Sequence, residues 1–159
     1  MNKNRYLVHA ASIAAVYAVL TIAFAPLSYG QIQVRFAEAL TILPFFTSAA
    51  IPGLFVGCIV ANFFGPGGML DVVFGSAATL IAAYISYKMP AKWLVPLPPI
   101  IANGLIIGLE LAIFTGAPFV STALYVALGE FLVVTVLGYP VFKVVMKNKT
   151  IQNLTQVTD

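Results

Sequence analysis

The sequence predicts an all-α membrane protein, a compact polytopic bundle of six transmembrane helices with both termini in the cytoplasm. Of its 159 residues, 61% are hydrophobic and only 8% are charged. Mean hydropathy is +1.00, far from the balance of a soluble domain. Apolar runs long enough to cross a bilayer recur along the whole chain. The alternating polarity of a transmembrane β-barrel strand does not occur. The length is that of one domain.

Turn signals divide the apolar sequence into six expected helices. Pro26 and Gly30 end the first, and the Gly-Pro-Gly-Gly run at 65–68 precedes the fourth. A polar link with prolines, 88–96, precedes the fifth helix, which the Gly-Ala-Pro run at 116–118 closes. The expected helices cover 7–25, 36–46, 52–64, 70–87, 97–115 and 120–145, and a polar cytoplasmic tail follows at 147–159.

Two considerations favour two crossings rather than one between residues 36 and 64. A single straight helix there would be about 43 Å long, too long for the hydrocarbon core, and it would contain Pro44 and Pro52. With six crossings and the N-terminus inside, seven of the eight basic residues are cytoplasmic and only Arg35 is outside. A five-crossing chain would place six of the eight outside, against the positive-inside rule.

Several function classes find no support in the sequence. His9 is the only histidine, and no second ligand accompanies it, so we expect no metal site. The Gly-rich loop with Lys-Ser/Thr that holds ATP phosphates is missing, and no nucleophile–base pair indicates an enzyme. Cys58 is the single cysteine, which excludes a disulfide framework. The net charge of +3 reflects topology, so we expect no nucleic-acid partner.

Arg35 and Glu38 form a pair of opposite charges between two apolar runs. At a spacing of three residues, their side chains share a helix face and can pair. Ionisable groups at membrane depth are costly and usually mark function. An interfacial ion pair that anchors the second helix is an equally good interpretation.

Two further carboxylates lie deep in the last two expected helices. Glu110 follows Asn103 by seven residues, which places both on one helix face, about 10 Å apart. Glu130 lies about ten residues from the outer end of its helix. A lipid-facing carboxylate costs at least about 2.5–3.5 kcal/mol, so we expect these side chains to point into the bundle. No basic residue on the last four helices is deep enough to pair with either acid, which favours function.

Asn62 and Asp71 lie at the outer ends of the third and fourth expected helices. Each has a structural alternative: Asn62 as a cap at a helix end, and Asp71 as an N-cap after the glycine-rich turn. Asn103 likewise suits an interhelical hydrogen bond. Together the polar residues of the outer half predict an outward-facing pocket, walled by aromatic side chains such as Tyr29, Phe74, Phe119 and Tyr125.

Alanines recur at every fourth position of the first helix, at Ala10, Ala14 and Ala18, beside Ala11 and Ala15. Small residues at this spacing allow another helix to approach closely. The approaching helix belongs either to this bundle or to a partner protein, and both readings stay open.

Six sequence blocks resemble the queuosine-precursor transporter (QueT-type) family, and the likeness extends from the first helix to Pro140. The blocks are VRFAEALTILP at 34–44, IPGLFVGCIVAN at 51–62, DVVFGS at 71–76, IANG at 101–104, GLE at 108–110 and LGE at 128–130.

The resemblance implies a substrate-binding S component of an energy-coupling factor (ECF) transporter, in the plasma membrane of a prokaryote. Such subunits have six helices and capture a micronutrient outside the cell. They dock on a membrane T subunit that carries two cytoplasmic ATPases, so ATP would be used by partners and not by this chain. The family's docking motif corresponds to Ala10, Ala14 and Ala18.

The implied ligand is a 7-deazaguanine such as preQ1, preQ0 or queuine. One carboxylate can accept two adjacent N–H groups of a guanine-like edge, an Asn suits a mixed donor–acceptor edge, and an aromatic ring can stack on the base. We therefore expect Glu110 or Glu130 to hold the edge, with help from Asn103. A second acid, Glu38 or Asp71, would take the cationic aminomethyl group of preQ1, and Arg35 would steady a covering loop.

Three alternatives compete with this interpretation. One is an S component for a vitamin such as riboflavin, thiamine or biotin, which would differ only in its pocket. Another is a self-sufficient channel or proton-coupled carrier in which Glu110 and Glu130 form a relay. A structural membrane scaffold is the weakest, because it leaves the deep carboxylates unexplained.

Overall fold

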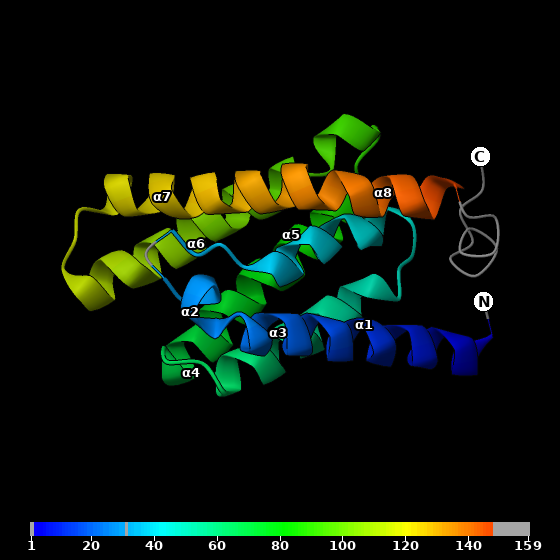
Figure 1. Cartoon of the computed structure of the whole chain (residues 1–159), viewed down its shortest axis with the longest axis horizontal. Helices are drawn as coiled ribbons and strands as arrows, with labels where there is room; N and C mark the ends of the chain where they lie inside the picture. Colours follow the sequence, from blue (N-terminus) through cyan, green and yellow to red (C-terminus); the bar gives the residue numbers. More distant parts are fainter. Residues whose placement is uncertain (1, 31, 148–159) are drawn as a thin grey trace.

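The structure is a computed structural model that describes residues 2–30 and 32–147. Helices and the turns that join them make up this part of the chain, with no strand in it. The predicted all-α bundle is therefore confirmed (Figure 1). All but Lys147 of the predicted polar tail at 147–159 lies outside the described residues.

The helical segments lie within four residues of the expected bounds. Two of the long helices are continuous rods of three pieces, each with a five-residue π-helical piece in the middle. In chain order the elements are α1 (Lys3–Ala23), α2 (Ala25–Ser28), η1 (Phe36–Phe45), α3 (Ala50–Phe63), α4 (Gly68–Leu70), η2 (Asp71–Gly75), α5 (Ser76–Tyr87), η3 (Lys92–Leu94), α6 (Leu97–Thr115), α7 (Phe119–Leu132), η4 (Val133–Leu137) and α8 (Gly138–Lys147).

Four helical rods are long and apolar enough to cross a membrane. The second and third expected helices are short. The four rods are Lys3–Ala23, Gly68–Tyr87, Lys92–Thr115 and Phe119–Lys147. At ten residues, the 3₁₀ helix η1 is only about 20 Å long, and at fourteen residues α3 is about 21 Å long. Pro44 lies inside η1. Of the six expected helices, four are thus long enough to span a membrane, and the other two are short, as their expected bounds already implied.

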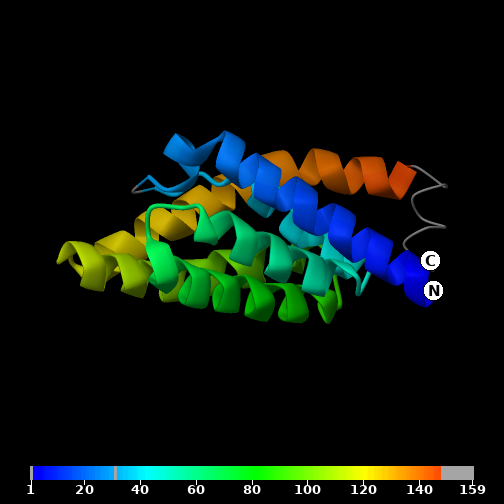
Figure 2. The same cartoon turned by 90° about the horizontal axis from the view of Figure 1, so that it is seen from below.

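The two ends of the described chain lie together. The first turn of α1 and the last turn of α8 occupy the same end of the bundle, and α2, α4 and the turn at 116–118 lie toward the opposite end (Figures 1 and 2). An even number of crossings would produce this arrangement. We call the end with α2 and α4 the outer end, in line with the predicted topology.

Glycines bring pairs of helices into close contact. A Cβ atom on Gly57 of α3 would lie 2.8 Å from the carbonyl oxygen of Ala14 on α1. On α6, a Cβ on Gly108 would lie 2.6 Å from the Cα of Ala123 on α7. Small residues of this kind allow helix backbones to approach closely within a membrane, and they set the distance between helices that carry the polar residues described below.

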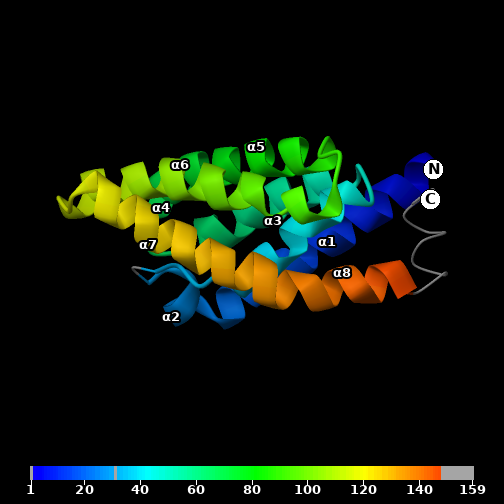
Figure 3. The same cartoon turned by 90° about the horizontal axis from the view of Figure 1, so that it is seen from above.

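The short helix η1 occupies the centre of the bundle. It contacts α1, α3, α5, α8 and η4, and Figure 3 shows it between the helices around it. Its buried residues include Ala37, Glu38 and Thr41. A carboxylate is therefore carried into the core on an element surrounded by other helices.

Candidate functional site

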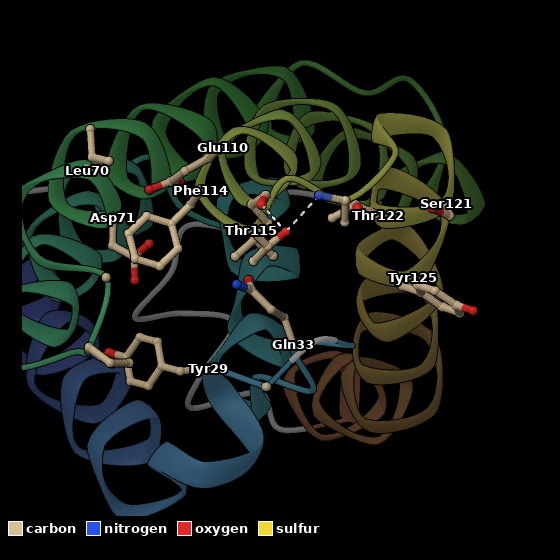
Figure 4. A pocket seen from close by; sticks show the side chains of 15 residues that line it. Tyr29, Gln33, Leu70, Asp71, Glu110, Phe114, Thr115, Ser121, Thr122 and Tyr125 are labelled. Carbon is tan, nitrogen blue, oxygen red and sulfur yellow. Dashed lines mark hydrogen bonds between the residues drawn. The ribbon is translucent and has the colours of Figure 1, made fainter.

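A cavity of ≈ 390 Å³ opens toward the outer end of the bundle. Its volume lies in the usual range for small-molecule sites, about 300–1,000 Å³. The wall comes from the loop after α2, from α4 and η2, from the second half of α6, and from α7 (Figure 4). Its main side chains are Tyr29, Gln33, Leu70, Asp71, Glu110, Phe114, Thr115, Ser121, Thr122 and Tyr125.

Two carboxyl groups share one wall of this cavity. Asp71 at the start of η2 and Glu110 on α6 are each only 8% exposed, and their carboxyl groups lie close enough to interact. Glu110 Oε2 has no hydrogen-bond partner among the described residues. A Cβ on Gly67 would collide with the Asp71 carboxyl group, so the glycine-rich turn makes room for this acid. Two neighbouring carboxylates attract a cation or a set of N–H donors.

Aromatic rings lie beside the acid pair. Phe114 and Tyr29 line the same cavity as Asp71 and Glu110 (Figure 4). Tyr29 is held in place because its hydroxyl donates a 2.7 Å hydrogen bond to the Ala61 carbonyl oxygen. Of the four aromatics predicted to wall the pocket, Tyr29 and Tyr125 do so. The prediction was wrong for Phe74 and Phe119, which do not line the cavity.

A second polar group, the deep cluster, consists of Tyr17, Glu38, Asn103 and Glu130, which are all buried. Asn103 Nδ2 donates a 2.7 Å hydrogen bond to Glu130 Oε1, and the same amide lies next to Glu38. The Tyr17 hydroxyl donates to Glu38 Oε1. The Oε2 atoms of both glutamates have no hydrogen-bond partner within the described part of the chain.

The deep cluster joins four elements, α1, η1, α6 and α7. None of its members lines the outer cavity. Asn103 and Glu110 are two turns apart on α6, so the two polar groups are about 10 Å apart along that helix. The interhelical hydrogen bond expected as the structural alternative for Asn103 is present.

Asn62 supports the site from behind. It is fully buried, and its Nδ2 donates a 2.7 Å hydrogen bond to the carbonyl oxygen of Asp71. It also donates to the Cys58 sulfur at 3.3 Å. Asn62 does not line the cavity, so its contacts are those of a residue that positions the backbone of η2.

Arg35 lies inside the bundle and not at the mouth of the pocket. It is buried, with its guanidinium 5.2 Å from the centre of the Tyr29 ring and Nη1 3.9 Å from the Cys58 sulfur. Glu38 interacts with it electrostatically. The Tyr29 ring and the Glu38 carboxylate compensate the Arg35 charge for its loss of water. Tyr29 lines the outer cavity and Glu38 belongs to the deep cluster, so Arg35 lies between the two sites.

The alanines of α1 divide between two faces. Ala10 and Ala14 lie against Gly53 and Gly57 of α3, and Ala18 is buried. Packing within the bundle, the structural alternative, is therefore present. Ala11 and Ala15 are exposed, and a docking role for this helix remains a prediction.

Some cavity residues gave no signal in the sequence. Gln33, Phe114 and Thr122 line the cavity although no charge or motif distinguishes them. Gln33 has a positive φ of 50°, an uncommon backbone conformation for a residue other than glycine. Tyr17 also belongs to the deep cluster, and no charge or motif in the sequence distinguishes it.

The chain matches known transporter proteins in sequence. The family model described as "QueT transporter" matches residues 7–147. A curated relative, the queuosine precursor transporter QueT of Lactococcus lactis subsp. cremoris, is 34% identical over 82 residues. That stretch covers 50% of this chain and 48% of the relative, so the two match over about half their lengths. No solved structure matches. Because the family model covers nearly all of the described residues, this membrane protein belongs to the QueT transporter family.

Proposed function

We propose that this chain is the substrate-binding S component of an ECF transporter that captures a queuosine precursor, a 7-deazaguanine, outside a prokaryotic cell. Family membership and the function of the Lactococcus relative, a queuosine precursor transporter, support the substrate class. The observation that carries the proposal is the outer cavity, with two carboxyl groups beside aromatic rings. Uptake would be driven by ATP at two cytoplasmic ATPases joined through a T subunit, while this chain would bind ligand, use no cofactor and catalyse no reaction.

The cavity suits the chemistry of preQ1. The carboxylate of Glu110 can accept two adjacent N–H groups of the guanine-like edge, and its unpartnered Oε2 gains a donor in this way. Asp71, on the same wall, would face the cationic aminomethyl group. The base would stack on Phe114 or Tyr29, and the Gln33 amide can meet a mixed donor–acceptor edge.

The deep cluster is the alternative binding site for the base. Glu130 and Asn103 already share a hydrogen bond, and the two unpartnered glutamate oxygens could accept donors from a ligand. Ligand in this position would need the side chains between the cavity and the cluster to move. The outer cavity needs no such movement, so we assign the edge to Glu110.

A panel of ligands, tested on the protein and its variants, examines both the substrate class and the position of the binding site. Thermal unfolding of the purified protein would be followed with preQ1, preQ0, queuine, riboflavin, thiamine and biotin. Binding at one hundred times Kd stabilises the folded protein by about 2.7 kcal/mol, so we expect the 7-deazaguanines alone to raise Tm. Glu110→Gln should abolish the ligand-induced increase in Tm, and Glu130→Gln should cause a smaller loss of that increase.

The matched control is Ser121→Ala. Ser121 lines the cavity, but its hydroxyl donates to the Pro118 carbonyl oxygen, so the ligand response should persist. A shift with a vitamin but with no 7-deazaguanine would refute the substrate class. A response lost in Glu130→Gln and kept in Glu110→Gln would move the base to the deep cluster.

A proton-coupled carrier is the second candidate function. The observation that favours it is the succession of carboxyl groups, from Asp71 and Glu110 to Glu130 and Glu38, with Arg35 nearby. Such a carrier would accumulate its substrate in liposomes without any ATPase. Accumulation that depends on a pH gradient in liposomes holding this chain alone would replace the S-component proposal.

A further inference from the structure

A second cavity lies near the opposite end of the bundle, where α8 ends. Its volume is ≈ 560 Å³. We call it the lysine groove, because its lining includes Lys92 from η3 and Lys143 and Lys147 from α8. It shares no lining residue with the outer cavity, and nothing in the proposed capture of a ligand uses it.

The groove carries positive charge without a neighbouring acid. Lys143 and Lys147 are four residues apart and so share one face of α8, while Lys92 reaches the groove from a different element. None of the described residues that line it is acidic. The four acidic residues that the structure describes are buried elsewhere, in the deep cluster and the outer cavity. Among the described residues, no acidic side chain compensates the three ammonium groups at this cavity.

Apart from Thr135, the rest of the lining is apolar or aromatic. Val134 and Phe142 belong to it, together with Trp93, which is 76% exposed. The exposed ring of Tyr139 lies 4.6 Å from the Lys143 ammonium. Exposed Trp and Tyr are typical of the level where hydrocarbon meets lipid headgroups. A suitable occupant thus combines an anionic head with an apolar tail.

We propose that the lysine groove binds an anionic phospholipid, with its phosphate among Lys92, Lys143 and Lys147 and an acyl chain along Val134 and Phe142. The groove lies at the end that the positive-inside rule assigns to the cytoplasm, where the leaflet surface is negative. Basic pockets between helices on that side hold acidic headgroups. A free phosphate would leave the apolar wall unused, and a zwitterionic lipid would leave the lysine charge uncompensated.

Native mass spectrometry of the delipidated full chain tests this proposal. The protein would be titrated with phosphatidylglycerol and with phosphatidylcholine of the same acyl chains. We expect selective retention of phosphatidylglycerol. Replacement of a lysine by glutamine should weaken the affinity for phosphatidylglycerol by about fivefold. The double variant Lys143→Gln/Lys147→Gln should therefore bind this lipid roughly 25-fold more weakly. Both lysines are exposed, so the variant should fold, and the 7-deazaguanine response checks this independently.

The matched control removes two other charges from the same end of the bundle. Lys3 and Arg5 lie on the first turn of α1 and do not line the groove, so Lys3→Gln/Arg5→Gln should retain the lipid. Equal retention of both lipids, or equal losses in the two double variants, would overturn the proposal. Displacement of the lipid by an equal concentration of glycerol phosphate would assign the site to phosphate alone. Loss of T-subunit binding in Lys143→Gln/Lys147→Gln with unchanged lipid retention would assign the groove to a protein partner.

Discussion

Individual polar residues in this chain divide into those that can meet a ligand and those that hold the site together. Asp71 and Glu110 line the outer cavity. Asn62 holds the backbone of Asp71 from behind, and Cys58 accepts hydrogen bonds from Asn62 and Thr79, each at 3.3 Å. Buried polar atoms cost stability unless they are paired, and Glu110 Oε2 has no hydrogen-bond partner among the described residues, so it can accept a donor from a ligand.

Asp71→Asn tests the role of the second acid at the cavity. It removes the negative charge that we assign to the aminomethyl group while preserving side-chain shape. A hydrogen bond to a charged group contributes about 1.5–3 kcal/mol, so affinity for preQ1 should fall by at least about tenfold, whereas neutral preQ0 should bind nearly as before. Isothermal titration calorimetry with both ligands measures the difference. An equal loss for the two ligands would contradict the charge assignment.

At the scale of elements, closely packed helix pairs determine where the polar side chains meet. Gly53 and Gly57 let α3 lie against α1, and this contact sets the place of Tyr17, which donates to Glu38 on η1. Gly104 and Gly108 do the same for α6 and α7, which carry Asn103 and Glu130. The deep cluster therefore depends on glycines that lie outside it.

Gly57→Ala should destabilise the bundle. The added Cβ would lie 2.8 Å from the Ala14 carbonyl oxygen and 2.9 Å from Tyr17 Cβ. Both contacts are with atoms that cannot rotate away, and overpacking of this kind costs about 1–3 kcal/mol. Thermal unfolding in detergent measures the loss. Gly138→Ala is the control, since a Cβ there meets nothing nearer than 3.4 Å. Equal stability of both variants would show that α1 and α3 can separate at no cost.

The whole molecule has a polarity along its length that suits a transport subunit. The ligand cavity opens at the outer end, and the lysine groove and both ends of the described chain lie toward the other (Figure 1). Along one side runs α1, with Ala11 and Ala15 exposed. In the proposed complex this exposed face of α1 meets the T subunit, while Ala10 and Ala14 hold α3.

Ala15→Trp tests this division of α1 into two faces. Because Ala15 is exposed, a bulky side chain there should leave folding and ligand-induced stabilisation intact while it prevents close approach of another helix. Co-purification with the T subunit and its ATPases should be lost. Val136→Trp, an exposed position on η4, is the control for adding a tryptophan to the membrane face. Full assembly of the Ala15 variant would place the docking surface elsewhere.

The sequence by itself determined the membrane class, the positions of the helical segments and the family resemblance, because each depends on runs of neighbouring residues. It also identified Asp71, Glu110 and Glu130 as acids in need of an explanation. Only the tertiary structure decided which acids meet: Asp71 with Glu110, and Glu130 with Asn103 and Glu38. It likewise buried Arg35 and turned Ala10 and Ala14 toward α3. The physical reason is that hydropathy is a local property. Contacts between helices depend on their rotation and spacing, which distant small residues set.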